Sequence, residues 1–350
     1  MRHLCSRLLL SLLIASSASA VTMDWTPIGN PGNACDPQTH IVTGAPLCFG
    51  AVAYAYDIGT YDVTNAQYAE FLNAKAAADP LGLYHTSMAN HLSGITRTGS
   101  SGSYSYSVIA GREEMPVNYV SFYDALRFAN WMNNGQGSAS TEIGAYTLLG
   151  PSNQYGEPSN GTTVMRNAGA AIVLPSENEW YKAAYYDATS ISYFDYPAGS
   201  DTQTNCAAPT AAANSANCGG VVGNLTIKGS YTGSASPYGT FDQGGNVWEW
   251  NDDIFDGYNC FAPSPQFSCR GFRGGSLSSG SSSLAASTRS GFDPAYAEFY
   301  NGFRLAMIPE PGTGLLVMAG LLGLAARRRG PPAPGHQPTV DGVDQGRVAS

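Results

Sequence analysis

The thirteen residues FDQGGNVWEWNDD, Phe241–Asp253, decide how this chain is interpreted. They contain two tryptophans, two adjacent glycines and four acidic residues. Gly244 and Gly245 let the backbone turn tightly, and carboxylate and carbonyl oxygens are the ligands that calcium prefers. The stretch therefore predicts either a metal-binding turn or a plain turn into a strand whose tryptophans belong to the core. At and just beyond its end, Asn251, Asp252, Asp253 and Asp256 are expected to form a solvated acidic edge, with a second site as the alternative.

The composition indicates an irregular, exported domain. Only 12% of the 350 residues are charged, about half of the usual share, and Gly, Ser, Ala, Asn and Tyr replace them. This mixture favours a loop-rich fold over a helical bundle. The net charge is -9, and an acidic surface repels phosphate backbones. Nucleic acid is therefore excluded as an expected partner.

The first twenty residues read as a secretory signal. A basic start precedes an apolar centre from Leu8 to Ala15, and the small residues Ala18 and Ala20 follow it. This order is typical of a signal peptide, here residues 1–20 with cleavage after Ala20. We expect the mature protein to be exported.

The far end carries a second apolar segment. Pro309-Glu310-Pro311 precedes an apolar run over 312–326, which ends in three arginines, 327–329. The run is short for a membrane span, which needs about 20 residues, and arginines remain on the cytoplasmic side. We expect a membrane anchor over 308–329, followed by a disordered Pro- and Gly-rich tail over 330–350.

Six cysteines remain after the signal peptide is removed, and they fall into three near-neighbour pairs. In an oxidising compartment this spacing favours three local disulfides, although other connectivities and free buried thiols stay open. The expected pairs are Cys35–Cys48, Cys206–Cys218 and Cys260–Cys269.

The same N-terminal capping pattern predicts the starts of three helices. A Ser or Thr is followed three residues later by Gln, Asp or Glu, which is the capping-box pattern. Apolar residues then recur at helical spacing, so we expect amphipathic helices over 64–73, 121–132 and 176–187. Short strands are expected over 56–63, 170–175, 246–251 and 302–307, and surface loops over 99–107 and 207–224.

Seven blocks now stand in one order: YDVTNAQYAEFL, MPVNYVSFYDALRFANWMN, LPSENEWYKAA, GGNVWEWNDD, FRGGS, TRSGF and NGFRLA. This order resembles the formylglycine-generating enzyme family, also called the sulfatase-modifying factor domain. The resemblance covers 44–307 and leaves 21–43 as an N-terminal extension. It implies an α+β fold of the irregular C-type-lectin-like kind, with little regular secondary structure and with calcium sites in its loops.

The resemblance also implies roles for individual residues. Calcium would be held by the side chains of Asp242 and Glu249 and by the backbone carbonyls of Gly245 and Val247. Three arginines in family positions are expected to form structural ion pairs, because a buried arginine needs carboxylate partners; substrate binding is the alternative. They are Arg273, Arg289 and Arg304.

The family's reactive centre is missing from the sequence. Its enzymes bind Cu(I) through two cysteines shortly after the GGS block, and soft thiolates select that ion. Here the matching positions are Ser279 and Leu284, so copper is not expected. Iron-dependent relatives of the ergothioneine type use three histidines, whereas His40, His85 and His91 show no ligand spacing.

Two functions remain open at this stage. The first is a non-catalytic exported module that binds a glycan or a protein at the cell surface or in the exopolysaccharide matrix. The second is an oxygen-dependent enzyme of the formylglycine-generating type with an unrecognised centre. The C-terminal segment resembles a PEP-CTERM sorting signal, which implies processing by an exosortase.

Overall fold

The structure is a computed structural model that describes residues 20–39, 44–153, 156–255, 260–261 and 269–309. Residues 1–309 belong to one unit, and a second unit, 310–350, lies outside the described residues. The predicted anchor beyond Pro309 and the predicted disordered tail therefore lie outside what is described. Among the described residues, no helix is long and apolar enough to span a bilayer.

Short elements joined by long loops build the described unit, as the composition predicts. The α-helices are α1 (Asn65–Lys75), α2 (Phe122–Asn133) and α3 (Glu177–Tyr185), with 3-10 turns at Thr86–Ala89, Gly161–Thr163 and Ser281–Leu284. The strands are β1 (Trp25–Ile28), β2 (Asp36–Thr39), β3 (Pro46–Phe49), β4 (Tyr56–Gly59), β5 (Ile95–Thr98), β6 (Ser105–Val108), β7 (Ile172–Val173), β8 (Tyr186–Asp187), β9 (Ser192–Tyr193), β10 (Asn205–Cys206), β11 (Ser215–Ala216), β12 (Trp248–Ile254), β13 (Cys260–Phe261), β14 (Arg270–Arg273), β15 (Ser290–Phe292), β16 (Asn301–Gly302) and β17 (Ala306–Met307).

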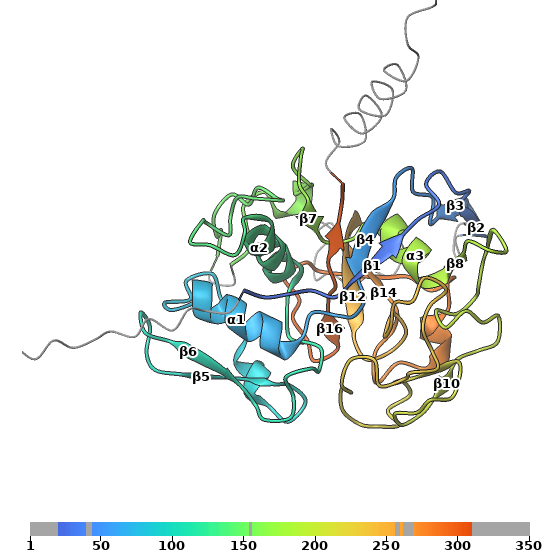
Figure 1. Cartoon of the computed structure of the whole chain (residues 1–350). Helices are drawn as coiled ribbons and strands as arrows, with labels where there is room; N and C mark the ends of the chain where they lie inside the picture. The colour runs from blue at the N-terminus through green and yellow to red at the C-terminus, as the bar shows by residue number, and fades with distance from the viewer. Residues whose placement is uncertain (1–19, 40–43, 154–155, 256–259, 262–268, 310–350) are drawn as a thin grey trace, which may run out of the picture. The chain divides into compact units, whose positions relative to one another are not determined.

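Two sheets occupy the centre of the unit (Figure 1). One has the order β1-β4-β17-β7 and the other the order β13-β15-β14-β12-β16. Helices α1 and α2 lie with the β5–β6 hairpin on one side of the sheets, and α3 lies with β2 and β3 on the other (Figure 1). Because β1 and β17 both pair with β4, the two ends of the domain close the same sheet. The segment 21–43, expected as an extension, thus contributes a strand to the central fold.

All three predicted helices are present, and each begins with its capping box. Thr64, Ser121 and Ser176 accept from the backbone N–H three residues on, and the side chain at that position returns a bond to the cap. Helix α2 differs from the amphipathic expectation, because every residue from Phe122 to Met132 is buried. The charge in its middle is paired with a residue beyond the helix: Arg127 Nε donates to a carboxylate oxygen of Glu142 at 2.6 Å.

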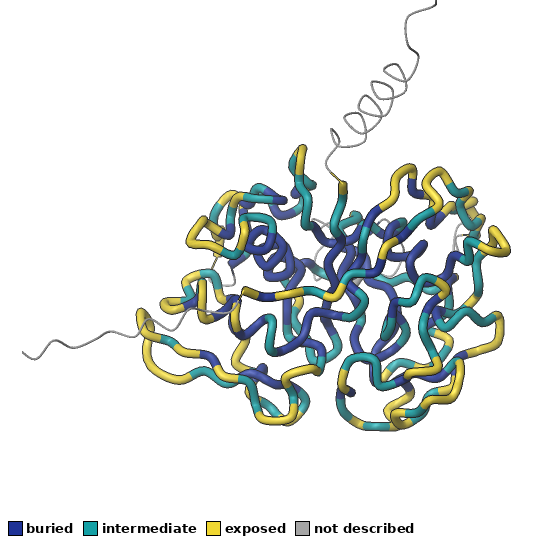
Figure 2. The backbone as a smooth tube through the Cα atoms, in the orientation of Figure 1, coloured by how far each residue is buried: buried dark blue, intermediate teal, exposed yellow. Residues whose placement is uncertain are grey.

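The core lies between the helices and the sheets, and exposure is concentrated in the peripheral loops (Figure 2). The main cluster joins aromatic residues of α1 and α2 to Phe303 and to Trp250 of the opening stretch. Trp250 is fully buried against Phe272, with ring centroids 3.7 Å apart.

The predicted strands are confirmed as β4, β7, β12, β16 and β17. The predicted surface loops are wrong in part. Ser105 already pairs with Thr98 in a hairpin, and within 207–224 the residues Ser215–Ala216 form the buried strand β11.

Two of the three predicted disulfides are formed between described residues. Cys35 directly precedes β2 and Cys48 lies near the end of β3, so their disulfide closes the open end of the β2–β3 hairpin. The Cys206–Cys218 disulfide closes the loop that follows β10. Cys269 is also disulfide-bonded. The side chain of its expected partner, Cys260, lies outside the described residues.

Candidate functional site

Glu249 of β12 lies in a fully buried ion-pair network. Arg304 donates to both of its carboxylate oxygens, from Nε at 2.5 Å and from Nη2 at 2.9 Å, and Trp180 Nε1 donates at 2.7 Å. Arg304 also donates to Asp62 at 3.2 Å. Burial and the charge of Glu249 raise the pKa of Asp62 well above its usual value, against the opposing effect of Arg304. The negative charge of Glu249 is thus already paired with the Arg304 guanidinium group.

A second buried carboxylate, Glu177 at the start of α3, serves two arginines. Arg273 Nε donates to it at 2.8 Å and Arg289 Nη2 donates to it at 2.7 Å. Arg273 continues to the carbonyls of Ala286 and Thr288, both at 2.7 Å. The arginine side chains lie over the Phe49 ring. The three arginines singled out by sequence therefore all lie beside carboxylates.

The other three predicted calcium ligands lie in the turn before β12. Asp242 has left-handed backbone (φ 61°) and accepts from the Gly229 N–H at 2.6 Å. Burial raises the pKa of Asp242 to about 6. Gly245 also has positive φ, and its N–H donates to Gly274 O at 2.9 Å. Val247 packs in a small apolar cluster with Leu225 and Leu277.

These four residues fit calcium only in part. Asp242 Oδ1 has no hydrogen-bond partner among the described residues, but an ion at Glu249 would have to compete with Arg304. Within the described residues, no group of three or more His, Cys, Asp or Glu side chains is arranged to hold a metal ion. The calcium site remains a prediction, with Asp242 as its better-placed carboxylate.

Ser279 and Leu284, at which the resemblance predicts thiols, both lie close to one glycine. A Cβ atom placed on Gly275 would lie 2.8 Å from Leu284 Cδ1 and 3.5 Å from Ser279 Cβ. Leu284 is fully buried and packs against Ala216 and Cys218, the latter held in its disulfide. The fold thus keeps the two positions adjacent while their side chains are a hydroxyl and an isobutyl group.

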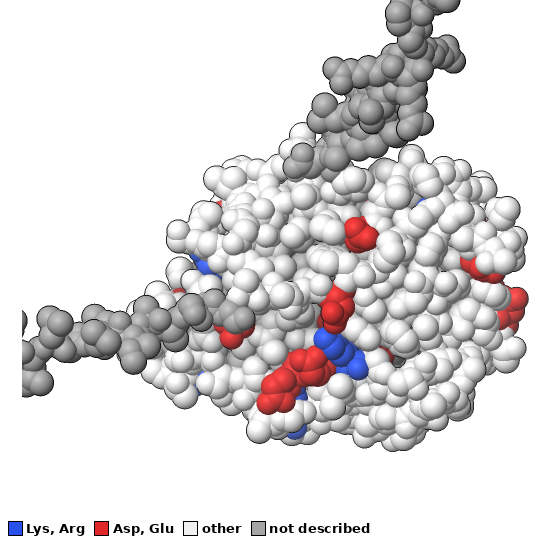
Figure 3. Space-filling model, viewed as in Figure 1, with Lys and Arg blue, Asp and Glu red and all other residues white. Residues whose placement is uncertain are grey.

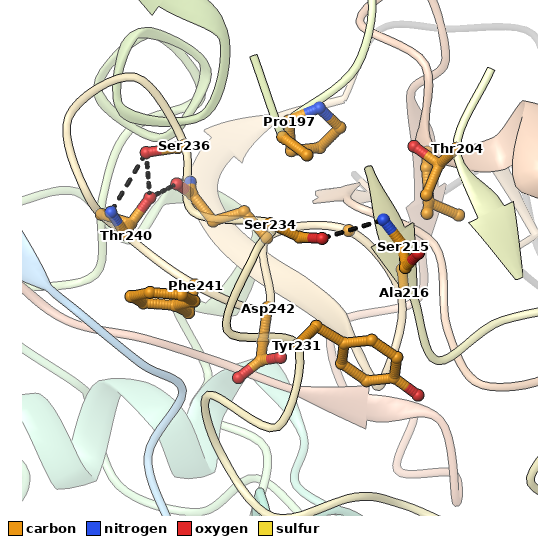
Figure 4. Close-up of a pocket in the computed structure, with 14 residues that line it drawn as sticks. Pro197, Thr204, Ser215, Ala216, Tyr231, Ser234, Ser236, Thr240, Phe241 and Asp242 are labelled. Atoms are coloured by element: carbon orange, nitrogen blue, oxygen red, sulfur yellow. Dashed lines mark hydrogen bonds between the residues drawn. The ribbon is translucent and has the colours of Figure 1, made fainter. Parts of the chain in front are cut away.

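A small pocket opens beside Leu284. Asp242 and Tyr231 lie along one edge, Ser236 and Thr240 along another, and Thr204 and Ser215 opposite them (Figure 4). The Thr240 hydroxyl lies 2.7 Å from that of Ser236, and the Ser215 N–H donates to Ser234 Oγ at 2.8 Å. The volume in which a water molecule can be centred is about 20 Å³. That is room for about one water-sized group.

The pocket was not foreseen, because its hydroxyls come from irregular loops between 197 and 243 and have no regular spacing in the sequence. The remaining predicted candidates lie elsewhere. His85 stacks on Tyr119 with ring centroids 5.1 Å apart, and burial lowers its pKa; His40 lies outside the described residues. The expectation of a solvated edge is wrong for Asp252, which is bound by Arg166 Nε at 2.5 Å and by the Tyr146 hydroxyl at 3.0 Å; Asp256 lies outside the described residues.

The fold defines a class: an irregular α+β domain of the C-type-lectin-like kind. The chain belongs to the family of sulfatase-modifying factor enzyme 1-like domains, whose model matches residues 48–308. A PEP-CTERM protein-sorting motif matches residues 308–329. Both predicted resemblances are confirmed, and the motif marks the chain as an exported protein sorted by an exosortase.

Individual relatives agree with the family. Hercynine oxygenase of Mycolicibacterium smegmatis is 26% identical over 324 residues, which cover 80% of this chain and 63% of that protein. Hercynine oxygenase of Mycolicibacterium thermoresistibile is 33% identical over 152 residues, 40% of this chain and 32% of the relative. The chain thus spans less than two thirds of the length of these relatives. Among solved structures, Treponema denticola variable protein 1 has a TM-score of 0.51 at 20% identity, covering 84% of this chain and 98% of that one.

Proposed function

We propose that this protein is an exported, non-catalytic member of its family that binds a polar ligand, such as a glycan of the exopolysaccharide matrix, at the cell surface. The observation that carries the proposal is the pair Ser279 and Leu284, which both lie close to Gly275, with Leu284 lining a pocket of hydroxyl groups. A serine hydroxyl is a hard ligand and stays protonated, so this pair cannot replace two thiolates for Cu(I).

The pocket is suited to one polar group of a larger ligand. Its hydroxyls can donate and accept, and Asp242 supplies a carboxylate oxygen that no described donor occupies. With a space of about 20 Å³, it admits a hydroxyl or amino group and leaves the body of the ligand outside. Figure 3 shows one face of the molecule, on which acidic and basic side chains gather near the lower centre and most of the remaining surface is uncharged. A chain with only 12% charged residues suits recognition of an uncharged polymer by hydrogen bonds.

The test is binding of soluble exopolysaccharide fragments, measured by calorimetry with the mature domain. Asp242→Asn and Thr240→Val each alter the pocket and should weaken binding about ten-fold, the loss expected for one buried hydrogen bond of roughly 1.4 kcal/mol. Thr96→Val, the same change on β5 outside the pocket, should leave binding unaltered. Equal affinity of all four proteins would reject the pocket as the binding site.

A second function is favoured by the relatives named hercynine oxygenase. In this alternative the chain is an oxygen-dependent enzyme with a centre of its own. Metal analysis of the purified protein separates the two: stoichiometric iron or copper supports the enzyme, whereas calcium alone supports the binding module. Calcium at Asp242 and the carbonyls of Gly245 and Val247 remains part of our proposal, and it should raise the melting temperature.

A further inference from the structure

The first residue of the mature chain is already part of the folded core. Val21, which follows the expected cleavage point, is 8% exposed and belongs to the main hydrophobic cluster. Met23 and Trp25 pack against the same cluster, whereas Ala20, Thr22 and Asp24 are exposed. This alternation of buried and exposed side chains begins at Val21. The folded core of the domain therefore starts directly after the Ala20–Val21 bond.

Both backbone groups of Val21 are held by one side chain. The Val21 N–H donates to Gln136 Oε1 at 2.6 Å, and Gln136 Nε2 donates to Val21 O at 2.7 Å. We call this pair of bonds the Gln136 clamp. The next residues are held as well: Gln67 Nε2 donates to Thr22 O at 2.8 Å, and the Thr60 N–H donates to Asp24 O at 2.8 Å.

Gln136 itself is fixed by the end of α2. It lies three residues beyond Asn133 in left-handed backbone conformation (φ 60°), and its N–H donates to Trp131 O at 2.9 Å. A cation near the C-terminal end of a helix is stabilised by the helix dipole. The clamp therefore presents an acceptor oxygen where the amino group of a newly formed N-terminus is favourable.

We propose that folding locks the bond that signal removal cuts, so that cleavage must come before Val21 docks. In the cleavage, water adds across the Ala20–Val21 peptide bond: Ala20 keeps the carboxylate, and the Val21 nitrogen leaves as an amine and takes up a proton. A protease must reach this bond in extended chain, but its nitrogen is bound by Gln136 and the adjoining side chain is buried. After cleavage, the α-ammonium group takes the place of the amide on the same Gln136 oxygen.

The test uses the full-length chain, purified with its disulfides formed and incubated in detergent with a purified leader peptidase. The folded precursor should be cut after Ala20 at least about ten-fold more slowly than a peptide of residues 10–30. The reason is that the protease cuts only those molecules in which the segment around Ala20 has transiently unfolded. Gln136→Ala should restore cutting towards the rate of the peptide. Gln203→Ala, at an exposed glutamine whose side chain donates to Ser281 Oγ, should not.

Cutting of the folded wild-type precursor at the rate of the peptide would overturn the proposal. So would a Gln136→Ala protein that melts like the wild type and is cut no faster. Should Gln136→Ala not fold, the mature wild-type protein provides the decision through its N-terminal amine. That amine should react with an acylating reagent about ten-fold more slowly in the folded than in the urea-unfolded protein, and equal rates would reject the clamp.

Discussion

The buried ion pairs and the hydroxyl pocket lie close together, but they agree with the family resemblance to different degrees. Glu249 and Glu177 retain arginine partners at 2.5–2.8 Å in the interior. Beside them lie Ser279 and Leu284, at the two positions where the family resemblance predicts thiols. The ion pairs are tied to folding, because an unpaired buried charge is strongly destabilising. Ser279 and Leu284 bury no charge, so in our proposal the residues at these positions can differ from those of the family's enzymes at little cost to the fold.

The largest expected effect comes from breaking the ion-pair side of this comparison. Glu177→Gln removes the carboxylate that Arg273 and Arg289 share. Leaving buried guanidinium groups without a partner charge should lower the free energy of unfolding by about 3–5 kcal/mol, measured by urea denaturation. Glu114→Gln is the matched control, because its partner Lys228 lies at the surface, and it should cost less than about 1 kcal/mol. Equal losses would mean that burial does not distinguish the two pairs.

The second prediction restores the missing ligands on the pocket side. The double variant Ser279→Cys/Leu284→Cys should bind Cu(I) about 100-fold more tightly than the wild type, because thiolates are soft donors. Competition with a Cu(I) chelator measures this change. Ser278→Cys/Ser282→Cys places two thiols at exposed positions nearby and serves as the control. If both pairs gain the same affinity, the positions around Gly275 are not a preserved ligand geometry.

The third prediction concerns the pH dependence of stability that Asp242 of the pocket causes. Burial raises the pKa of Asp242 to about 6, against about 3.9 in an unfolded chain. The folded state therefore binds the proton more tightly, and this group stabilises the fold as pH falls from 6 towards 4. Asp242→Asn should be more stable than the wild type by about 3 kcal/mol at pH 7 in calcium-free buffer. The difference should vanish near pH 4; parallel curves from pH 4 to 8 would contradict the raised pKa.

The smallest expected effect tests the helix that carries Glu177. Ser176 caps α3 by accepting from the Glu179 N–H at 3.2 Å. Ser176→Ala should cost about 1 kcal/mol in urea denaturation, well below the loss for Glu177→Gln, while Ser192→Ala, at an exposed position of β9, should change little. A loss as large as that of Glu177→Gln would mean that the cap, rather than the shared carboxylate, holds the arginines in place.

Local signals in the sequence predicted the elements well. Capping boxes depend on residues three apart, and the two disulfides close loops of 13 and 12 residues, so both can be read from neighbouring letters. The partners of the arginines could not be read in this way, because Arg273 reaches Glu177 across 96 residues. The pocket was also beyond reach: its hydroxyls come from irregular loops, and the left-handed backbone of Asp242 and Asn246 has no reliable local signal.

The most direct test of the central claim is an activity assay on the purified mature domain with its disulfides intact. The protein is incubated with copper, oxygen and a peptide containing the CxPxR motif, and mass spectrometry follows conversion of the peptide cysteine to the aldehyde. We predict no conversion and no tight binding of Cu(I), because Ser279 and Leu284 offer no soft ligand. Formation of the aldehyde at a rate that depends on copper would contradict the account and would place an active redox centre in this domain.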